Sequence, residues 1–180
     1  ILCYLQSFGT LSSPRNAGNE NFVLKNKNVE LVFANDKEFL FKEFRMDGIN
    51  ILPANGSTTH PWQLIYRGPN GENPTLMPRW GEYKGGEIQE NQDVSTLVFT
   101  WEMLIDTGPK CPVRMLVSLA KDAGLPEWRI EAEMPEGWVI TESEFPRIAA
   151  NRPEGAKAIL PVGFGTEYTI GGEGQLQSRY

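Results

Sequence analysis

The sequence predicts an all-β protein, an antiparallel β-sandwich, from three observations. Apolar and polar residues alternate in at least five short segments, as they do in strands that bury one face. Gly, Pro, Asn and Asp separate these segments, and the strands recur about every dozen residues, which is typical of a sandwich. No window of helical length carries the apolar spacing of three and four that an amphipathic helix needs.

The first half of the chain contains three predicted strands. Residues 29–33 alternate before an Asn-Asp turn, and residues 39–46 form a longer strand that ends at Asp47-Gly48. Residues 49–52 follow at once. An Asp-Gly pair between apolar runs favours a tight hairpin, because both residues tolerate positive φ.

The second half contains the longest alternating face of the chain, at residues 97–105. The pattern returns at 113–119 and 128–134, and a further strand is predicted within 138–148. Trp101 and Trp128 lie on the apolar faces of these strands, so we expect both to belong to the core.

Residues 53–86 differ from the rest of the chain. They contain five prolines, and only residues 63–67 resemble a strand. Long irregular segments inside a compact domain are usually functional loops or lids. We therefore predict a single sandwich domain over residues 21–180 that carries this irregular segment.

Residues 1–20 are predicted to be a leader that precedes the domain. The apolar start, Ile1 to Leu5, is followed by small residues that suit the end of a secretory signal peptide. An ordinary first strand at residues 1–9 explains the same pattern, and both interpretations stay open. The chain has no apolar run of the roughly 20 residues that a membrane-spanning helix needs.

The charge of the chain limits its partners. Lys and Arg total 17 against 23 Asp and Glu, for a formal net charge of −6, with no basic cluster. Nucleic-acid binding needs clustered Lys and Arg, so nucleic acid is not an expected partner. Neutral glycans are compatible with this charge.

Several kinds of catalytic or cofactor site are excluded by residue counts. His60 is the single histidine, so neither a Ser-His-Asp triad nor a histidine-based metal site can form. Cys3 and Cys111 are too few for a cysteine metal cluster. The glycine pairs near residues 163 and 171 lack the residues of a phosphate-binding loop. We predict no metal and no cofactor.

Glu142 and Glu144 are the one candidate catalytic pair. They lie two residues apart on a predicted strand, hence on one face and about 7 Å apart along the backbone. Glycosidases use two carboxyl groups roughly 5–10 Å apart. Such pairs are also common on solvated strand faces, so catalysis and a polar surface are both kept as hypotheses.

Aromatic residues of the irregular segment are the better candidates for binding. Sugars stack on flat aromatic rings while polar groups bind their hydroxyls. Trp62, Trp80 and Tyr83 could form such a platform, and the alternative is that they anchor the segment on the sandwich. The polar residues predicted beside it are Arg67, Arg79 and Glu82.

The order of several short motifs resembles galactose-mutarotase-like domains. The first are Phe22 to Asn26 with residues 29–33, and then Gly48-Ile49-Asn50-Ile51-Leu52. The later ones are Trp62-Gln63-Leu64, Glu127-Trp128-Arg129-Ile130, Glu144-Phe145-Pro146-Arg147-Ile148 and Leu160-Pro161-Val162-Gly163-Phe164-Gly165. Over residues 22–170 the chain is similar to the N-terminal β-supersandwich of bacterial glycoside hydrolases, of the endo-α-N-acetylgalactosaminidase type or related families.

This resemblance implies a non-catalytic domain of an exported glycoside hydrolase. The acid and nucleophile would lie in a downstream TIM barrel, and this domain would support the barrel and contact oligo- or polysaccharide. The domain would be secreted, or located in the periplasm or at the cell surface. Mutarotases use two histidines and a glutamate, so His60 alone does not meet their pattern. Domains of this type continue beyond Gly165 into further strands, so the resemblance implies a sandwich truncated at its C-terminal end. A stand-alone carbohydrate-binding module and a glycosidase using Glu142 and Glu144 are the alternatives.

Overall fold

The structure is a computed structural model with two compact units, residues 1–149 and 150–180. It describes residues 21–35, 41–54, 56, 60–71, 73–105 and 108–151, and the backbone of three later strands. The predicted leader, residues 1–20, lies outside these residues. The prediction of one domain reaching residue 180 stays a prediction.

The first unit consists of eleven described strands and one 3-10 turn. The strands are β1 (Phe22–Lys25), β2 (Val29–Phe33), β3 (Phe41–Met46), β4 (Ile49–Asn50), β5 (Gln63–Arg67), β6 (Thr75–Leu76), β7 (Glu82–Glu90), β8 (Val94–Leu104), β9 (Lys110–Ala120), β10 (Glu127–Ala132) and β11 (Val139–Glu144). The 3-10 turn, η1, spans Pro78–Trp80. No other helix occurs in the described residues, and every pairing is antiparallel.

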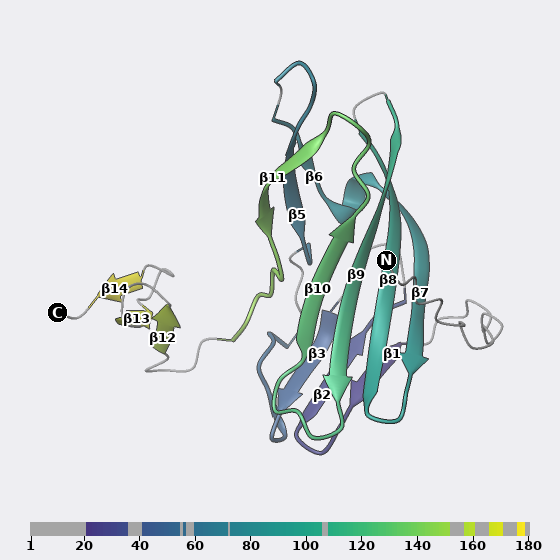
Figure 1. Cartoon of the computed structure of the whole chain (residues 1–180). Helices are drawn as coiled ribbons and strands as arrows, with labels where there is room; N and C mark the ends of the chain where they lie inside the picture. The colour runs from purple at the N-terminus through teal and green to yellow at the C-terminus, as the bar shows by residue number, and fades with distance from the viewer. Residues whose placement is uncertain are drawn as a thin grey trace, which may run out of the picture. The chain divides into compact units, whose positions relative to one another are not determined.

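These strands form three sheets, with orders β1-β2-β3-β4, β10-β9-β8-β7 and β11-β5-β6. Figure 1 shows β7 to β10 as one layer, with β1, β2 and β3 behind its lower half. The core lies between these two layers, since Phe22 of β1 meets Phe99 of β8 with ring centroids 5.7 Å apart. The prediction of an all-β antiparallel sandwich is confirmed.

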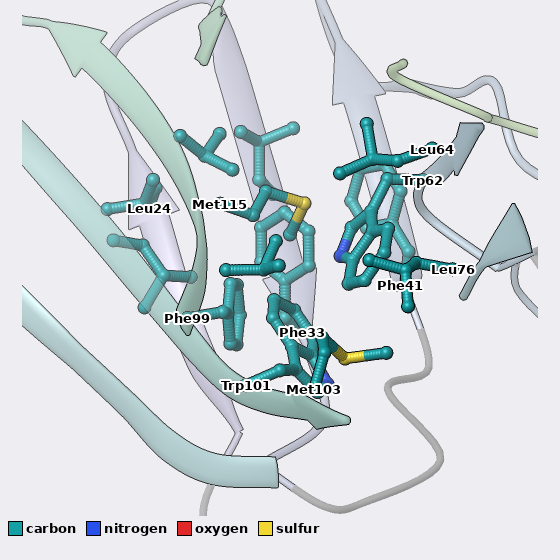
Figure 2. Packing of buried hydrophobic residues seen from close by; sticks show 14 of the residues in the cluster. Leu24, Phe33, Phe41, Trp62, Leu64, Leu76, Phe99, Trp101, Met103 and Met115 are labelled. Carbon is teal, nitrogen blue, oxygen red and sulfur yellow. The ribbon is translucent and has the colours of Figure 1, made fainter. Parts of the chain in front are cut away.

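Alternation along the strands decides which side chains enter the core. On β8, Leu97, Phe99, Trp101 and Met103 are fully buried, and the residues between them face the other side of the sheet. On β9, every second residue from Cys111 to Leu119 is buried in the same way. Figure 2 shows these side chains meeting Leu24 and Phe33 from the opposite sheet. Each fully buried large apolar side chain stabilises the fold by roughly 1.5–3 kcal/mol.

The third sheet closes one end of this core. Trp62 precedes β5, and Leu64, Tyr66 and Leu76 of β5 and β6 join it in the buried cluster. In Figure 2 Trp62, Leu64 and Leu76 lie together beside Phe41. β5 has the predicted bounds, 63–67, but the irregular segment 53–86 also contains β6, η1 and the first residues of β7. Much of that segment is therefore ordered and packed.

The predicted Asp47-Gly48 hairpin is confirmed. Met46 pairs with Ile49, so the connection between β3 and β4 is only two residues long. Asp47 has φ 49° and Gly48 has φ 82°, the two positive values of a type I′ turn. The short β4 then ends where Asn50 Oδ1 accepts hydrogen bonds from the backbone N–H groups of Phe44 and Leu52, each at 3.2 Å.

Two asparagines make equivalent turns, and one of them also joins the two main sheets. Asn26 Oδ1 accepts the backbone N–H groups of Asn28 and Val29 in the β1–β2 turn, and Asn91 does the same for Asp93 and Val94. Asn26 Nδ2 additionally donates to the carbonyls of Ala120 and Ala123, at 2.8 and 2.9 Å. This amide ties the first hairpin to the end of β9.

The edge strand β7 is the longest element that the alternation did not predict. Its sequence is Glu-Tyr-Lys-Gly-Gly-Glu-Ile-Gln-Glu, and no residue in it is fully buried. A Cβ at Gly86 would lie 2.8 Å from the Phe22 ring and 3.0 Å from Phe99. Glycine at this position therefore lets two core rings reach the backbone of the edge strand.

The second unit contains a three-stranded antiparallel sheet of order β12-β13-β14. Its strands are β12 (Lys157–Leu160), β13 (Thr166–Ile170) and β14 (Leu176–Ser178). Among all described residues, no helix is long and apolar enough to cross a membrane.

Candidate functional site

Trp62 does not belong to a binding platform, which corrects one part of the sequence interpretation. Its side chain is fully buried, with its ring centroid 5.6 Å from that of Trp101 in an edge-to-face arrangement. Among the described residues, its Nε1–H has no hydrogen-bond acceptor. Neither ring face can reach a ligand, so Trp62 anchors the irregular segment on the sandwich, as the alternative hypothesis held.

Tyr83 also faces inward, from β7. Its ring lies 5.7 Å from Trp101 and 6.5 Å from Phe99 by centroids. Its hydroxyl donates to Asn35 Oδ1 at 3.2 Å, so it connects β7 with the residues that follow β2. Tyr83 is half-buried and packs against the core, and its predicted role in sugar binding stays a prediction.

Trp80, Arg79 and Glu82 lie together at the surface. Trp80 ends η1 and is 52% exposed, and the Arg79 guanidinium lies over its ring at 5.0 Å from the centroid. Glu82 begins β7 two residues later and is also exposed. This part of the predicted platform is accessible to a ligand.

A shallow depression of about 290 Å³ adjoins these residues and brings in three that the sequence did not single out. Its lining residues are Trp80, Glu82, Glu102, Leu104 and Lys110. The alternation of β8 places Glu102 and Leu104 outward, because Trp101 and Met103 are buried. The outward direction of Glu102 and Leu104 could be predicted from the alternation along β8. The pairing of Glu82 with Glu102 depends on β7, which the sequence did not predict.

Two lysines balance the charges of this depression. Lys84 Nζ lies 2.7 Å from Glu82 Oε2 and 3.6 Å from Glu102 Oε1, and Lys110 Nζ lies 2.6 Å from Glu102 Oε1. The hydrogen bond from Lys110 is the main reason that the pKa of Glu102 is below its usual range. The hydrogen bond to Glu82 raises the pKa of Lys84. The Glu102 carboxylate therefore remains a hydrogen-bond acceptor at neutral pH.

Arg67 belongs to a different sheet from Glu82 and Glu102. It ends β5 in the β11-β5-β6 sheet, whereas Glu82 and Glu102 belong to the sheet of β7 to β10. It is exposed, and its Nε donates to Asn73 Oδ1 at 3.4 Å. Its predicted role in glycan binding stays a prediction.

Glu142 and Glu144 lie on the edge strand β11, whose six residues are all exposed. A bulge falls between Ile140 and Glu142, and Glu144 pairs with Gln63 of β5. Glu144 Oε2 accepts Arg147 Nε at 3.1 Å. Both carboxyls are therefore exposed to solvent on an edge strand, and their catalytic role stays a hypothesis.

His60 lies in a cationic neighbourhood. Partial burial is the largest cause that lowers the pKa of His60, and the charges of Arg79 and Arg147 lower it further. Arg147 is held beside it by the backbone bond from its N–H to the Pro61 carbonyl, at 2.9 Å. The imidazole is therefore neutral at pH 7. Within the described part of the chain, no group of three or more His, Cys, Asp or Glu side chains could hold a metal ion.

Cys111 is predicted to be almost unreactive in the folded chain. It is fully buried, with Sγ 3.6 Å from Met134 Sδ, and burial raises the pKa of its thiol from 9.0 to about 11. Because only the thiolate reacts, alkylation at pH 8 in a Cys3→Ser background should be at least ~100-fold slower in buffer than in urea. Mass spectrometry of samples quenched over time measures both rates. Equal rates would contradict the buried position of this side chain.

Comparison with known proteins gives one strong similarity. A protein named "Putative glycoside hydrolase", from Bacteroides thetaiotaomicron, is 85% identical over 182 aligned residues. The alignment covers all of this chain and 27% of that protein, so the chain spans about a quarter of its relative's length. No family model matches the chain. No solved structure matches it either.

Proposed function

We propose that this chain is a non-catalytic β-sandwich domain of an exported glycoside hydrolase. The observation that carries the proposal is the 85% identity, along the whole chain, to a protein whose name describes a glycoside hydrolase and which is almost four times as long. The all-β fold and the exposed, ion-paired setting of Glu144 on β11 support a structural or binding role over a catalytic one.

The proposal includes a galactose-mutarotase-like sandwich. Two residues of its Gly48-to-Leu52 motif have clear structural roles here, since Gly48 completes the I′ turn and Asn50 closes the short β4 through two backbone hydrogen bonds. His60 is a single, neutral imidazole, which supports a domain without epimerase chemistry. Secretion to the periplasm or the cell surface is part of the same proposal.

The catalytic groups would lie in the part of the relative that this chain does not cover. If 182 residues are 27% of that protein, the remainder is roughly twice the ~250 residues of a TIM barrel. Exposed apolar side chains outside the core, such as Ile49 at 70% and Leu125 at 65%, are available for contact with another domain. We propose that the sandwich stabilises the barrel through such contacts.

The proposal is tested with the full-length relative and with this chain alone. We expect the full-length protein to hydrolyse at least one substrate from a panel of aryl glycosides and soluble polysaccharides, and the 180-residue chain to hydrolyse none. Glu142→Gln and Glu144→Gln should leave the full-length kcat within about twofold, because both carboxyls are exposed on the edge strand β11 and the catalytic groups would lie outside this chain. If the isolated chain hydrolyses a substrate and these substitutions abolish that activity, the glycosidase alternative is established instead.

A further inference from the structure

The depression beside Trp80 combines an apolar floor with a polar rim. Trp80 and Leu104 are 52% and 59% exposed, which is high for apolar side chains on a sheet whose opposite face is a complete core. The cross-strand register places Glu82 opposite Glu102 and Leu104 opposite Lys110, so the carboxylates and the ammonium line the same depression as these two side chains. Each lining residue comes from η1, β7, β8 or β9.

Trp80 is held in place although it is exposed. A Cβ built on Gly81 would overlap the Met103 sulfur, so the backbone after η1 packs directly on a fully buried core side chain. The Gly81 N–H also donates to the Pro78 carbonyl at 3.1 Å, which closes the turn. Arg79 lies over the ring and limits its rotation. An aromatic ring held in this way loses little conformational entropy when a ligand stacks on it.

The charged rim is costly for the fold and useful for a polyhydroxylated ligand. Like charges directly opposite on neighbouring strands destabilise a sheet, and exposed ion pairs restore little of that cost. Glu82 and Glu102 are nevertheless paired in this way and bridged by Lys84. The result is a fixed set of two carboxylate acceptors and an ammonium donor, Lys110, at the edge of an aromatic surface.

We propose that this depression is a binding subsite for one neutral pyranose residue of a glycan, which stacks on Trp80 and forms hydrogen bonds with Glu82, Glu102 and Lys110. Its volume of about 290 Å³ lies at the lower limit of the roughly 300–1,000 Å³ typical of small-molecule sites, which suits a single ring. The two carboxylates, Glu82 and Glu102, pair with two lysines, Lys84 and Lys110, so these four charges sum to zero, which suits a neutral sugar. The choice of a sugar as ligand rests on the proposed function.

The test uses the 180-residue chain with ¹⁵N-labelled tryptophan. Its five Trp residues give five indole N–H signals, which are titrated with methyl pyranosides of glucose, galactose, mannose and xylose, and with soluble polysaccharides. We expect the Trp80 signal to shift on binding and the signals of buried Trp62 and Trp101 to stay in place. Trp80→Ala should weaken binding at least 10-fold, and Glu102→Gln about three- to tenfold.

Leu125→Ala is the matched control, because Leu125 is 65% exposed but lies outside the depression. It should leave the affinity unchanged. The proposal is overturned if no sugar shifts the Trp80 signal, or if binding survives Trp80→Ala in a chain that remains folded by circular dichroism.

The full-length relative distinguishes this proposal from the function on which it rests. Hydrolysis of a glycan by that protein, with no effect of Trp80→Ala on glycan binding, would leave the proposed function in place and remove the subsite. Protection of Trp80 from N-bromosuccinimide in the full-length protein without any ligand would show that another domain covers this surface, and would also overturn the subsite. If no glycan is bound or hydrolysed by either protein, both proposals fail.

Discussion

Replacing Trp101 by alanine should lower the free energy of unfolding by about 3–5 kcal/mol, the range for deleting a large aromatic side chain from a core. Trp101 is fully buried on β8. Its ring contacts Trp62, Tyr83 and Phe99, at centroid distances of 5.6, 5.7 and 6.1 Å. The substitution removes the centre of the aromatic cluster where the third sheet meets the two main sheets.

Urea unfolding followed by circular dichroism measures this effect. Trp80→Ala is the matched control, since Trp80 is half exposed and should cost no more than about 1 kcal/mol, mainly from its contact with Arg79. If Trp101→Ala does not fold, Trp101→Phe keeps part of the ring contacts and should show a smaller loss. Similar losses for Trp101→Ala and Trp80→Ala would mean that the described core is wrong.

Asn26→Asp should destabilise the sandwich by about 2–4 kcal/mol at pH 7. The change is nearly isosteric and keeps the acceptor that receives the N–H groups of Asn28 and Val29. It replaces the amide donor, however, with a carboxylate oxygen facing the carbonyls of Ala120 and Ala123. Two hydrogen bonds are lost, and the new charge is repelled by both carbonyl oxygens, although Ala120 O keeps the bond from the Ala123 N–H at 3.2 Å.

Asn91→Asp isolates this effect. Asn91 makes the same turn, with Oδ1 accepting the N–H groups of Asp93 and Val94 at 2.9 and 2.8 Å, but it is exposed. Its substitution should change the free energy of unfolding by no more than about 0.5 kcal/mol. Comparable losses for the two variants, measured by urea unfolding at pH 7, would show that the link from Asn26 to the end of β9 contributes nothing.

Strands with a clear apolar face could be predicted from the sequence, and the edge strand β7 could not. β8 and β9 were found because one face of each is buried along nearly its whole length. β7 was missed because an edge strand buries little, so its residues carry no alternation, and Gly86 is required by the rings of Phe22 and Phe99. That requirement arises from tertiary packing and is invisible in the local sequence.

The candidate site could be predicted only in part, for a related reason. Trp62 and Trp80 lie in the same proline-rich segment, where no periodicity indicates which way a ring points, and one proved buried and the other exposed. Glu102 and Leu104 were on the outward positions of a predicted strand, but nothing local connects them with Glu82. Glu82 lies next to Glu102 only because of the register between β7 and β8.

The hydrogen bonds of Asn26 to Ala120 and Ala123 join residues 94 and 97 positions apart, which has a consequence during synthesis. At translation rates of about 5–20 residues per second, the first hairpin leaves the ribosome roughly 5–20 seconds before the strands that cover it. During that interval the apolar face of Leu24, Leu31 and Phe33 has no partner sheet. A nascent chain with such late contacts folds slowly and is a natural client for chaperones that shield exposed strands.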